Sequence, residues 1–67
     1  FNSENLYYLG LSYFYLNKYE DAINCFGSCL ELGVFTYDLS ISLAKVLELS
    51  GDIETAKEYY DKALELK

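Results

Sequence analysis

The sequence predicts an all-α protein made of two tandem helix-turn-helix units, which together form four antiparallel helices. Three observations support this fold class. Apolar residues recur at helical spacing along almost the whole chain. None of the 67 residues is a proline, so nothing interrupts the helices in that way. The apolar pattern also repeats after a shift of 34 residues.

The first two helices are expected near residues 3–16 and 19–32. Their apolar rhythm is carried by Leu6, Leu9, Gly10, Tyr13 and Leu16 in the first, and by Tyr19, Ala22, Ile23, Phe26, Cys29 and Leu30 in the second. Asn17 and Lys18 separate the two runs. Gly33 suits the position just past a helix end, where φ is often positive.

The third and fourth helices are expected near residues 37–49 and 53–66. Their apolar residues are Leu39, Leu43, Val46 and Leu47 in the third, and Ile53, Ala56, Tyr60, Ala63 and Leu64 in the fourth. Ser50, Gly51 and Asp52 separate them, and Asp52 is a suitable N-cap for the fourth helix. Turns this short place successive helices antiparallel.

The internal repeat matches residues by size. A shift of 34 places small residues on small ones and large apolar residues on large ones: Gly10 on Ala44, Ala22 on Ala56, Tyr13 on Leu47 and Phe26 on Tyr60. Small residues let the two helices of a hairpin approach closely, and the large side chains fill the space beside them. Each unit is therefore expected to be one helical hairpin of a repeat architecture.

Composition excludes several classes of function. The net charge of −6 repels phosphate backbones and anionic membranes, so nucleic acid and membrane partners are not expected. Apolar runs are too short to span a bilayer. The chain has no histidine, no serine in a nucleophile motif and no glycine-rich phosphate loop, so neither an enzyme nor a cofactor is predicted.

The cysteines are predicted to be packing residues. Cys25 and Cys29 are four residues apart, a spacing that would distort a helix if they formed a disulfide. Without a histidine they cannot complete a tetrahedral zinc site, so no metal is expected. Unpaired cysteines of this kind favour a reducing compartment, and hence a cytoplasmic location.

On these residues the chain resembles the tetratricopeptide repeat (TPR) family. The first repeat matches the family pattern at Leu9, Gly10, Tyr13, Ala22, Phe26 and Cys29, and the second at Leu43, Ala44, Leu47, Ala56, Tyr60 and Ala63. Leu6 and Ser40 stand at the Trp-like position, and Val34 stands where the family has proline. The resemblance implies a short right-handed α-solenoid in a single domain, 1–67, with repeat one at about 3–36 and repeat two at about 37–67.

The resemblance further implies a non-catalytic protein–protein interaction module. The first helix of each repeat would line a concave groove that binds a peptide or partner protein. Matched position by position, the expected binding residues are Tyr7, Tyr8, Leu11, Phe14, Tyr15, Ile41, Lys45 and Glu48. Tyr13, Tyr19 and Phe26 match packing positions instead. Adjacent exposed aromatic residues usually mark an interaction site in a soluble protein.

The nature of the partner follows from charge. The family's clamp for carboxylate tails is missing except for Lys45, because Tyr7, Leu11 and Ile41 occupy its other positions. The expected ligand is an extended or helical peptide with apolar anchors and basic flanks, which Glu4, Asp38 and Glu48 would meet.

An alternative reading gives the chain no separate ligand. In this reading it is a structural or oligomerisation segment of a longer array, or a self-associating fragment that forms a homo-oligomer. A further repeat or a second copy would then cover the aromatic face, with helix exchange across Gly33 or Ser50–Gly51 as one route to self-association.

Overall fold

The computed structural model describes residues 3–66 and contains four helices and no strand within that range. The helices are α1 (Ser3–Tyr15), α2 (Tyr19–Glu31), α3 (Tyr37–Ser50) and α4 (Ile53–Leu66). Each predicted helix is present, and no predicted boundary differs from the observed one by more than one residue. The all-α fold class, with two successive helical hairpins, is therefore confirmed.

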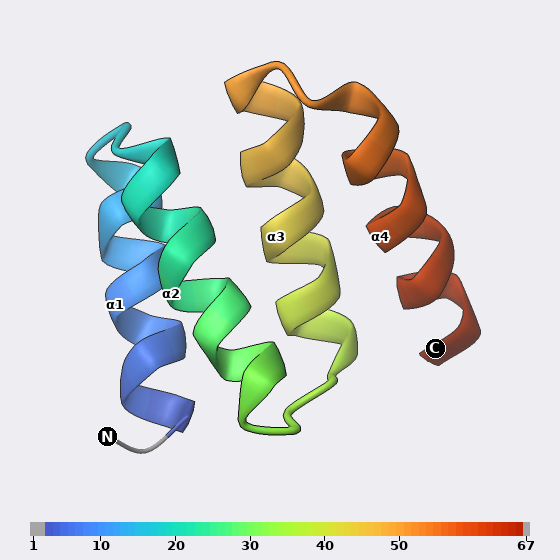
Figure 1. Cartoon of the computed structure of the whole chain (residues 1–67), viewed down its shortest axis with the longest axis horizontal. Coiled ribbons are helices and arrows are strands. Elements are labelled where there is room, and N and C mark those ends of the chain that lie inside the picture. Colours follow the sequence, from blue (N-terminus) through green and yellow to red (C-terminus); the bar gives the residue numbers. More distant parts are fainter. Residues whose placement is uncertain (1–2, 67) are drawn as a thin grey trace.

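The four helices lie side by side in chain order and run alternately up and down (Figure 1). The α1–α2 and α3–α4 turns are at one end of the molecule, and the α2–α3 loop is at the other. Contacts are most extensive within the hairpins α1–α2 and α3–α4, and α2 joins them by packing on α3. As a result the amino ends of α1 and α3 lie at the same end, next to the α2–α3 loop.

Left-handed residues end the first three helices. Gly33 (φ 86°) follows α2 and Gly51 (φ 104°) follows α3, as expected for glycine. Asn17 takes the same role after α1 with φ 63°, which the sequence analysis did not assign. At each site the next residue's amide donates back into the final helical turn, for example Lys18 N to Tyr13 O at 2.8 Å. These bonds satisfy carbonyls that would otherwise lack partners.

Side chains cap the second hairpin's helices. The Asp52 carboxylate accepts a hydrogen bond from the Thr55 amide at 3.3 Å, which confirms its predicted role at the start of α4. At the start of α3, the Thr36 hydroxyl oxygen accepts one from the Leu39 amide at 3.1 Å. This second cap fixes the point where the α2–α3 loop becomes helix.

The core is centred on α2 and α3, with Phe26 as the largest fully buried side chain. A Cβ placed on Gly10 would lie 2.6 Å from Cε1 of the Phe26 ring, so α1 approaches α2 as closely as only glycine allows. Ala22, Ala44 and Ala56 are also buried. The predicted pairing of small residues with large neighbours is present in the first hairpin.

The two cysteines are buried and form no disulfide. Burial raises the pKa of the Cys25 thiol, and the nearby Asp21 carboxylate raises it further. Burial likewise raises the pKa of Cys29, with a smaller contribution from Cys25. Both groups therefore stay protonated and unreactive at neutral pH, as packing residues do.

Ser40 is the one buried side chain among residues 3–66 whose hydroxyl has no hydrogen-bond partner. Its Oγ loses contact with water on folding without compensation, and alanine is the better helix former. We expect Ser40→Ala to raise the free energy of unfolding by about 1 kcal/mol, measured by urea denaturation. Ser42→Ala is the matched control in the same helix: it removes a hydroxyl that is bonded to Tyr7, so no comparable gain is expected. An equal gain in both variants would show that helix propensity alone is responsible.

Candidate partner-binding surface

The exposed aromatic surface of α1 consists of two ring pairs. The Tyr7 and Tyr8 rings meet edge to face with centroids 5.7 Å apart. The Phe14 and Tyr15 rings are 5.5 Å apart. In each pair the first ring is half-buried and packed against the core, and the second projects into solvent. Tyr8 is 57% exposed and Tyr15 is 77% exposed.

The exposed members of these pairs form one stripe along α1. Residues four and seven apart share a helix face, so Glu4, Tyr8 and Tyr15 are aligned. Two helical turns separate Tyr8 from Tyr15, which is about 10.5 Å along the axis. The stripe therefore presents one carboxylate followed by two phenol rings.

A parallel stripe runs along α3. Asp38, Ser42, Lys45 and Leu49 recur at helical spacing on one face of this helix. The Tyr7 hydroxyl lies 3.3 Å from the Ser42 hydroxyl, within hydrogen-bond distance. This contact, between residues 35 apart in the chain, places Tyr7, which is next to the α1 stripe, against the α3 stripe. We call the surface formed by Glu4, Tyr7, Tyr8, Tyr15, Asp38, Ser42, Lys45 and Leu49 the α1–α3 face.

A hollow of about 270 Å³ opens at one end of the α1–α3 face. Tyr7 forms part of its wall, and Cys29, Val34 and Leu39 provide apolar atoms. The remaining lining residues are polar: Glu4, Thr36 and Asp38. The hollow lies where α1 and α3 begin, beside the α2–α3 loop.

The predicted binding residues divide into two groups. Tyr7, Tyr8, Tyr15 and Lys45 belong to the α1–α3 face as defined above. Leu11 lies on the same side of α1 as Tyr15, but its side chain, like those of Tyr7 and Phe14, is half-buried and packs against the core. Ile41 and Glu48 are seven residues apart and share one side of α3, next to the side that carries Lys45.

Glu48 lies toward α4. Burial raises the pKa of the Tyr60 phenol in α4, and the nearby Glu48 carboxylate raises it further. Sequence reasoning assigned Glu48 to the same face as Tyr8. The hollow and its lining by Cys29, Val34 and Thr36 were not foreseen, because those residues come from the end of α2 and the loop.

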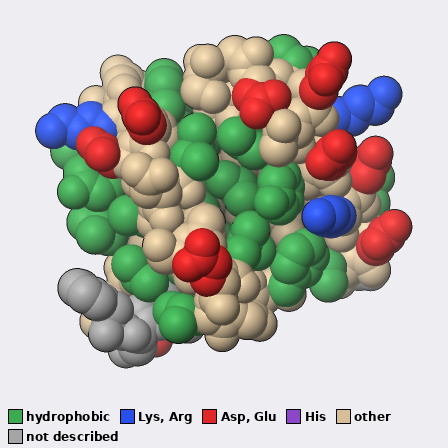
Figure 2. Space-filling view, viewed as in Figure 1, with side chains coloured by type: hydrophobic (Ala, Val, Ile, Leu, Met, Phe, Trp, Pro, Cys, Tyr) green, Lys and Arg blue, Asp and Glu red, His purple; other side chains and the backbone are tan. Residues whose placement is uncertain are grey.

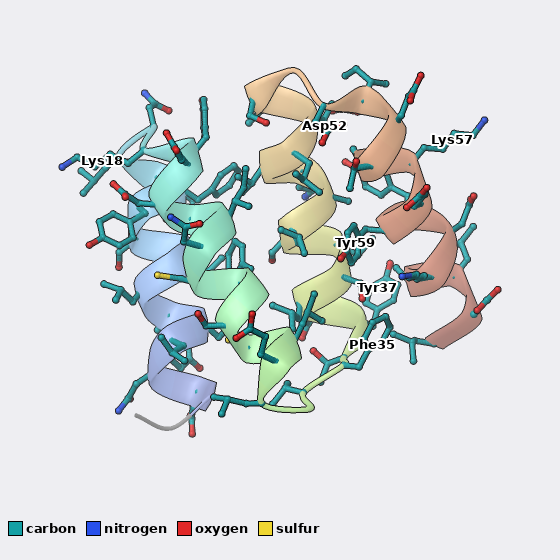
Figure 3. All side chains as sticks on the ribbon, viewed as in Figure 1. Lys18, Phe35, Tyr37, Asp52, Lys57 and Tyr59 are labelled. Carbon is teal, nitrogen blue, oxygen red and sulfur yellow. The ribbon has the colours of Figure 1, made fainter. Side chains whose placement is uncertain are left out.

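A second apolar surface is formed by side chains of α2, α3 and α4. Figure 2 shows hydrophobic side chains in a band across the middle of this face, with acidic side chains around its edges. A hollow of about 180 Å³ within it is lined by residues that include Leu30, Leu43 and Tyr59. Phe35, Tyr37 and Tyr59 lie together beside it (Figure 3). The Lys62 ammonium lies 5.0 Å from the Tyr59 ring centroid and 5.9 Å from that of Phe35.

Other kinds of site lack support in the described part of the chain. Residues 3–66 contain no group of three or more His, Cys, Asp or Glu side chains arranged to hold a metal ion. None of the described helices is both long and apolar enough to cross a membrane.

The fold and its open face define a helical-repeat protein of the kind that generally mediates protein–protein interactions. Models of the tetratricopeptide repeat match residues 3–32 and residues 37–67, and the chain belongs to that family. It is 38% identical over 63 residues to the TPR repeat-containing protein MJ0798 of Methanocaldococcus jannaschii, an alignment that covers 92% of this chain and 19% of that protein. No solved structure gives a significant match. Members of this family are generally non-catalytic scaffolds.

Proposed function

We propose that the chain binds a partner protein through the α1–α3 face and has no catalytic activity of its own. The observation that carries this proposal is the exposure of Tyr8 and Tyr15 on one stripe of α1. Neither ring is needed to fill the core, since Tyr7 and Phe14 beside them already pack there. Large exposed aromatic side chains supported by a packed neighbour are typical anchors of protein interfaces.

The spacing of the two tyrosines suggests an extended ligand. A chain in the polyproline II conformation advances about 3.1 Å per residue and completes one turn every three residues. Its residues i and i+3 therefore point the same way and lie about 9.3 Å apart, close to the distance of about 10.5 Å between Tyr8 and Tyr15. The partner segment is thus proposed to carry two apolar anchors at positions i and i+3. A helical ligand lying parallel to α1 would instead place them seven residues apart.

The charge of the chain favours a basic partner. The protein carries a net charge of −6, and Glu4 and Asp38 both lie on the α1–α3 face. Long-range attraction of this kind accelerates association and disfavours acidic competitors. Lys45 is the one cation on the face as defined above.

The test uses peptides selected from a phage-displayed random library on the immobilised protein. We expect Tyr8→Ser combined with Tyr15→Ser to weaken binding of the selected peptides at least tenfold, because loss of one aromatic anchor typically costs about 2 kcal/mol or more. Binding is measured by fluorescence anisotropy. Phe14 is left intact because it packs against the core, so its replacement would lower the stability of the protein as well as its affinity for the peptide.

The matched control is Phe35→Ser combined with Tyr37→Ser. It also removes two exposed aromatic rings, but from the region between α3 and α4 (Figure 3). The control variant is expected to bind the peptides as the parent does. Equal weakening by both double variants, or none by either, would contradict the proposal.

A second candidate function, self-association or packing against further repeats, is favoured by apolar residues on the outer helices. Leu16, in the turn directly after α1, is 66% exposed, and Leu64 of α4 is 68% exposed. These residues would suit contacts between neighbouring units of a repeat array. If this is the sole function, the library yields no peptide that depends on Tyr8 and Tyr15, and sedimentation shows concentration-dependent association.

A further inference from the structure

We infer that the hollow at the amino ends of α1 and α3 receives a lysine or arginine side chain of the partner. This inference rests on the proposed function and assigns a specific chemistry to one part of the α1–α3 face. It is carried by the combination of an apolar wall, a pair of carboxylates and a volume suited to a single side chain.

The apolar part of the hollow suits the stem of a long basic side chain. Cys29, Val34 and Leu39 contribute to its lining, and Leu39 and Cys29 are almost completely buried. Lysine and arginine commonly lay their methylene groups along such surfaces while the charged head stays near water. The volume of about 270 Å³ is at the lower limit of small-molecule pockets, which measure about 300–1,000 Å³.

The polar part of the hollow suits the charged head. Glu4 and Asp38 are exposed carboxylates in the first turns of α1 and α3, and both line the hollow. A helix amino end carries about half a positive charge, so the two helix ends together repel a cation as about one positive charge would. The two carboxylates contribute two negative charges. The balance favours a cation over an anion.

The described lysines lie elsewhere. Lys18 is in the α1–α2 turn at the opposite end of the molecule (Figure 3). Lys45 is seven residues beyond Asp38, or about 10.5 Å along α3. Lys57 is on α4, away from α1 (Figure 3), and Lys62 lies over the Tyr59 and Phe35 rings. A cation from the partner would therefore meet these carboxylates without displacing any of these four lysines.

The position of the hollow also sets the register of the ligand. Glu4 precedes Tyr8 by one helical turn, or about 6 Å along α1. A ligand in the polyproline II conformation, at about 3.1 Å per residue, covers that distance in about two residues. The basic residue is therefore placed about two positions from the apolar anchor that contacts Tyr8, on the side away from the anchor that contacts Tyr15.

The experiment uses a library-selected peptide and an analogue in which norleucine replaces its basic residue. Norleucine keeps the apolar stem and removes the charge. We expect the parent protein to bind the analogue about tenfold more weakly, since the charge of the basic residue would meet two carboxylates at once. The double variant Glu4→Gln with Asp38→Asn should bind the basic peptide about tenfold more weakly than the parent protein does. It should bind the norleucine peptide almost as well as the parent does. This non-additive pattern is the signature of direct contact.

The matched control variant is Asp21→Asn combined with Glu54→Gln. It also removes two negative charges, but from the first turns of α2 and α4, which begin at the other end of the molecule. That end is about 20 Å away along the helices, beyond the screening length of about 8 Å at physiological salt. We expect this variant to bind the basic peptide within about twofold of the parent.

The possible failures are distinguishable. Peptides that depend on Tyr8 and Tyr15 but show no basic residue, or no coupling to Glu4 and Asp38, would overturn this inference and leave the proposed function standing. Equal weakening by the control variant would also overturn it, because only long-range charge would then matter. A library that yields no tyrosine-dependent peptide would overturn the proposed function and this inference together.

Discussion

Replacement of Phe26 by alanine is expected to lower the free energy of unfolding by about 3–5 kcal/mol. Phe26 is completely buried and lies against α1, where its ring is 5.8 Å from that of Tyr7. It belongs to the same core cluster as Leu39 and Leu43 of α3. Its removal would leave a cavity where α1, α2 and α3 meet, and the helices can close it only in part.

The expected loss is comparable to the whole stability of the chain. A protein of 67 residues is typically stable by about 3–10 kcal/mol. Phe26→Ala should therefore be largely unfolded, which far-UV circular dichroism and urea titration measure. The control is Tyr15→Ala, which also removes an aromatic ring from a helix but from a side chain that is 77% exposed. Its effect should stay within about 0.5 kcal/mol.

This comparison separates the two roles of the aromatic residues. If Phe26→Ala cost less than about 1 kcal/mol, or if Tyr15→Ala cost as much, the division into core and surface rings would be wrong. Tyr7 belongs to both groups, because it contacts Phe26 on one side and Tyr8 on the other. The core therefore supports the candidate binding surface directly.

Most of the fold was predictable because it depends on local signals. Helical spacing of apolar residues and the breakers Gly33 and Gly51 fix the helices within one residue of their observed ends. The repeated pattern of small and large residues predicts which helices pair. Asn17 was missed as a left-handed residue because asparagine occurs in many other conformations, whereas glycine at a helix end is a strong signal.

The candidate site was less predictable because it depends on how α3 crosses α1. Tyr7 and Tyr8, like Phe14 and Tyr15, are successive residues, about 100° apart around the helix axis. Periodicity alone does not show which member of each pair faces the neighbouring helix. The contact between Tyr7 and Ser42 settles this for the first pair. Such a contact between distant residues has no signature in a single sequence.

Replacement of Gly10 by alanine should destabilise the protein although alanine is the better helix former. The new methyl group would lie 2.6 Å from Cε1 and 2.9 Å from Cδ1 of the buried Phe26 ring. Overpacking of this kind destabilises a protein by about 1–3 kcal/mol, whereas the higher helix propensity of alanine stabilises it by about 1 kcal/mol relative to glycine. Because several ring atoms collide with the methyl group, we expect a net loss of about 1–2 kcal/mol by urea denaturation.

Gly27 provides the matched control, since it is a helical glycine next to Phe26 in the chain. A Cβ on Gly27 meets nothing within 4 Å, so Gly27→Ala should raise stability by about 0.5–1 kcal/mol. Opposite signs for the two substitutions would locate the effect of Gly10 in packing, not in propensity. A gain in both would show that the helices separate easily at this crossing.

The contact itself is tested by shrinking the ring. In a Phe26→Leu background the colliding aromatic edge is absent, so Gly10→Ala should cost at least 1 kcal/mol less than it does in the parent. Additive effects of the two substitutions would mean that Gly10 and Phe26 do not interact, and that the close approach of α1 to α2 has another cause. Coupling would show that the repeat's pairing of glycine with an aromatic ring is a direct physical contact, which sets how closely α1 packs and hence where Tyr7 and Tyr8 lie.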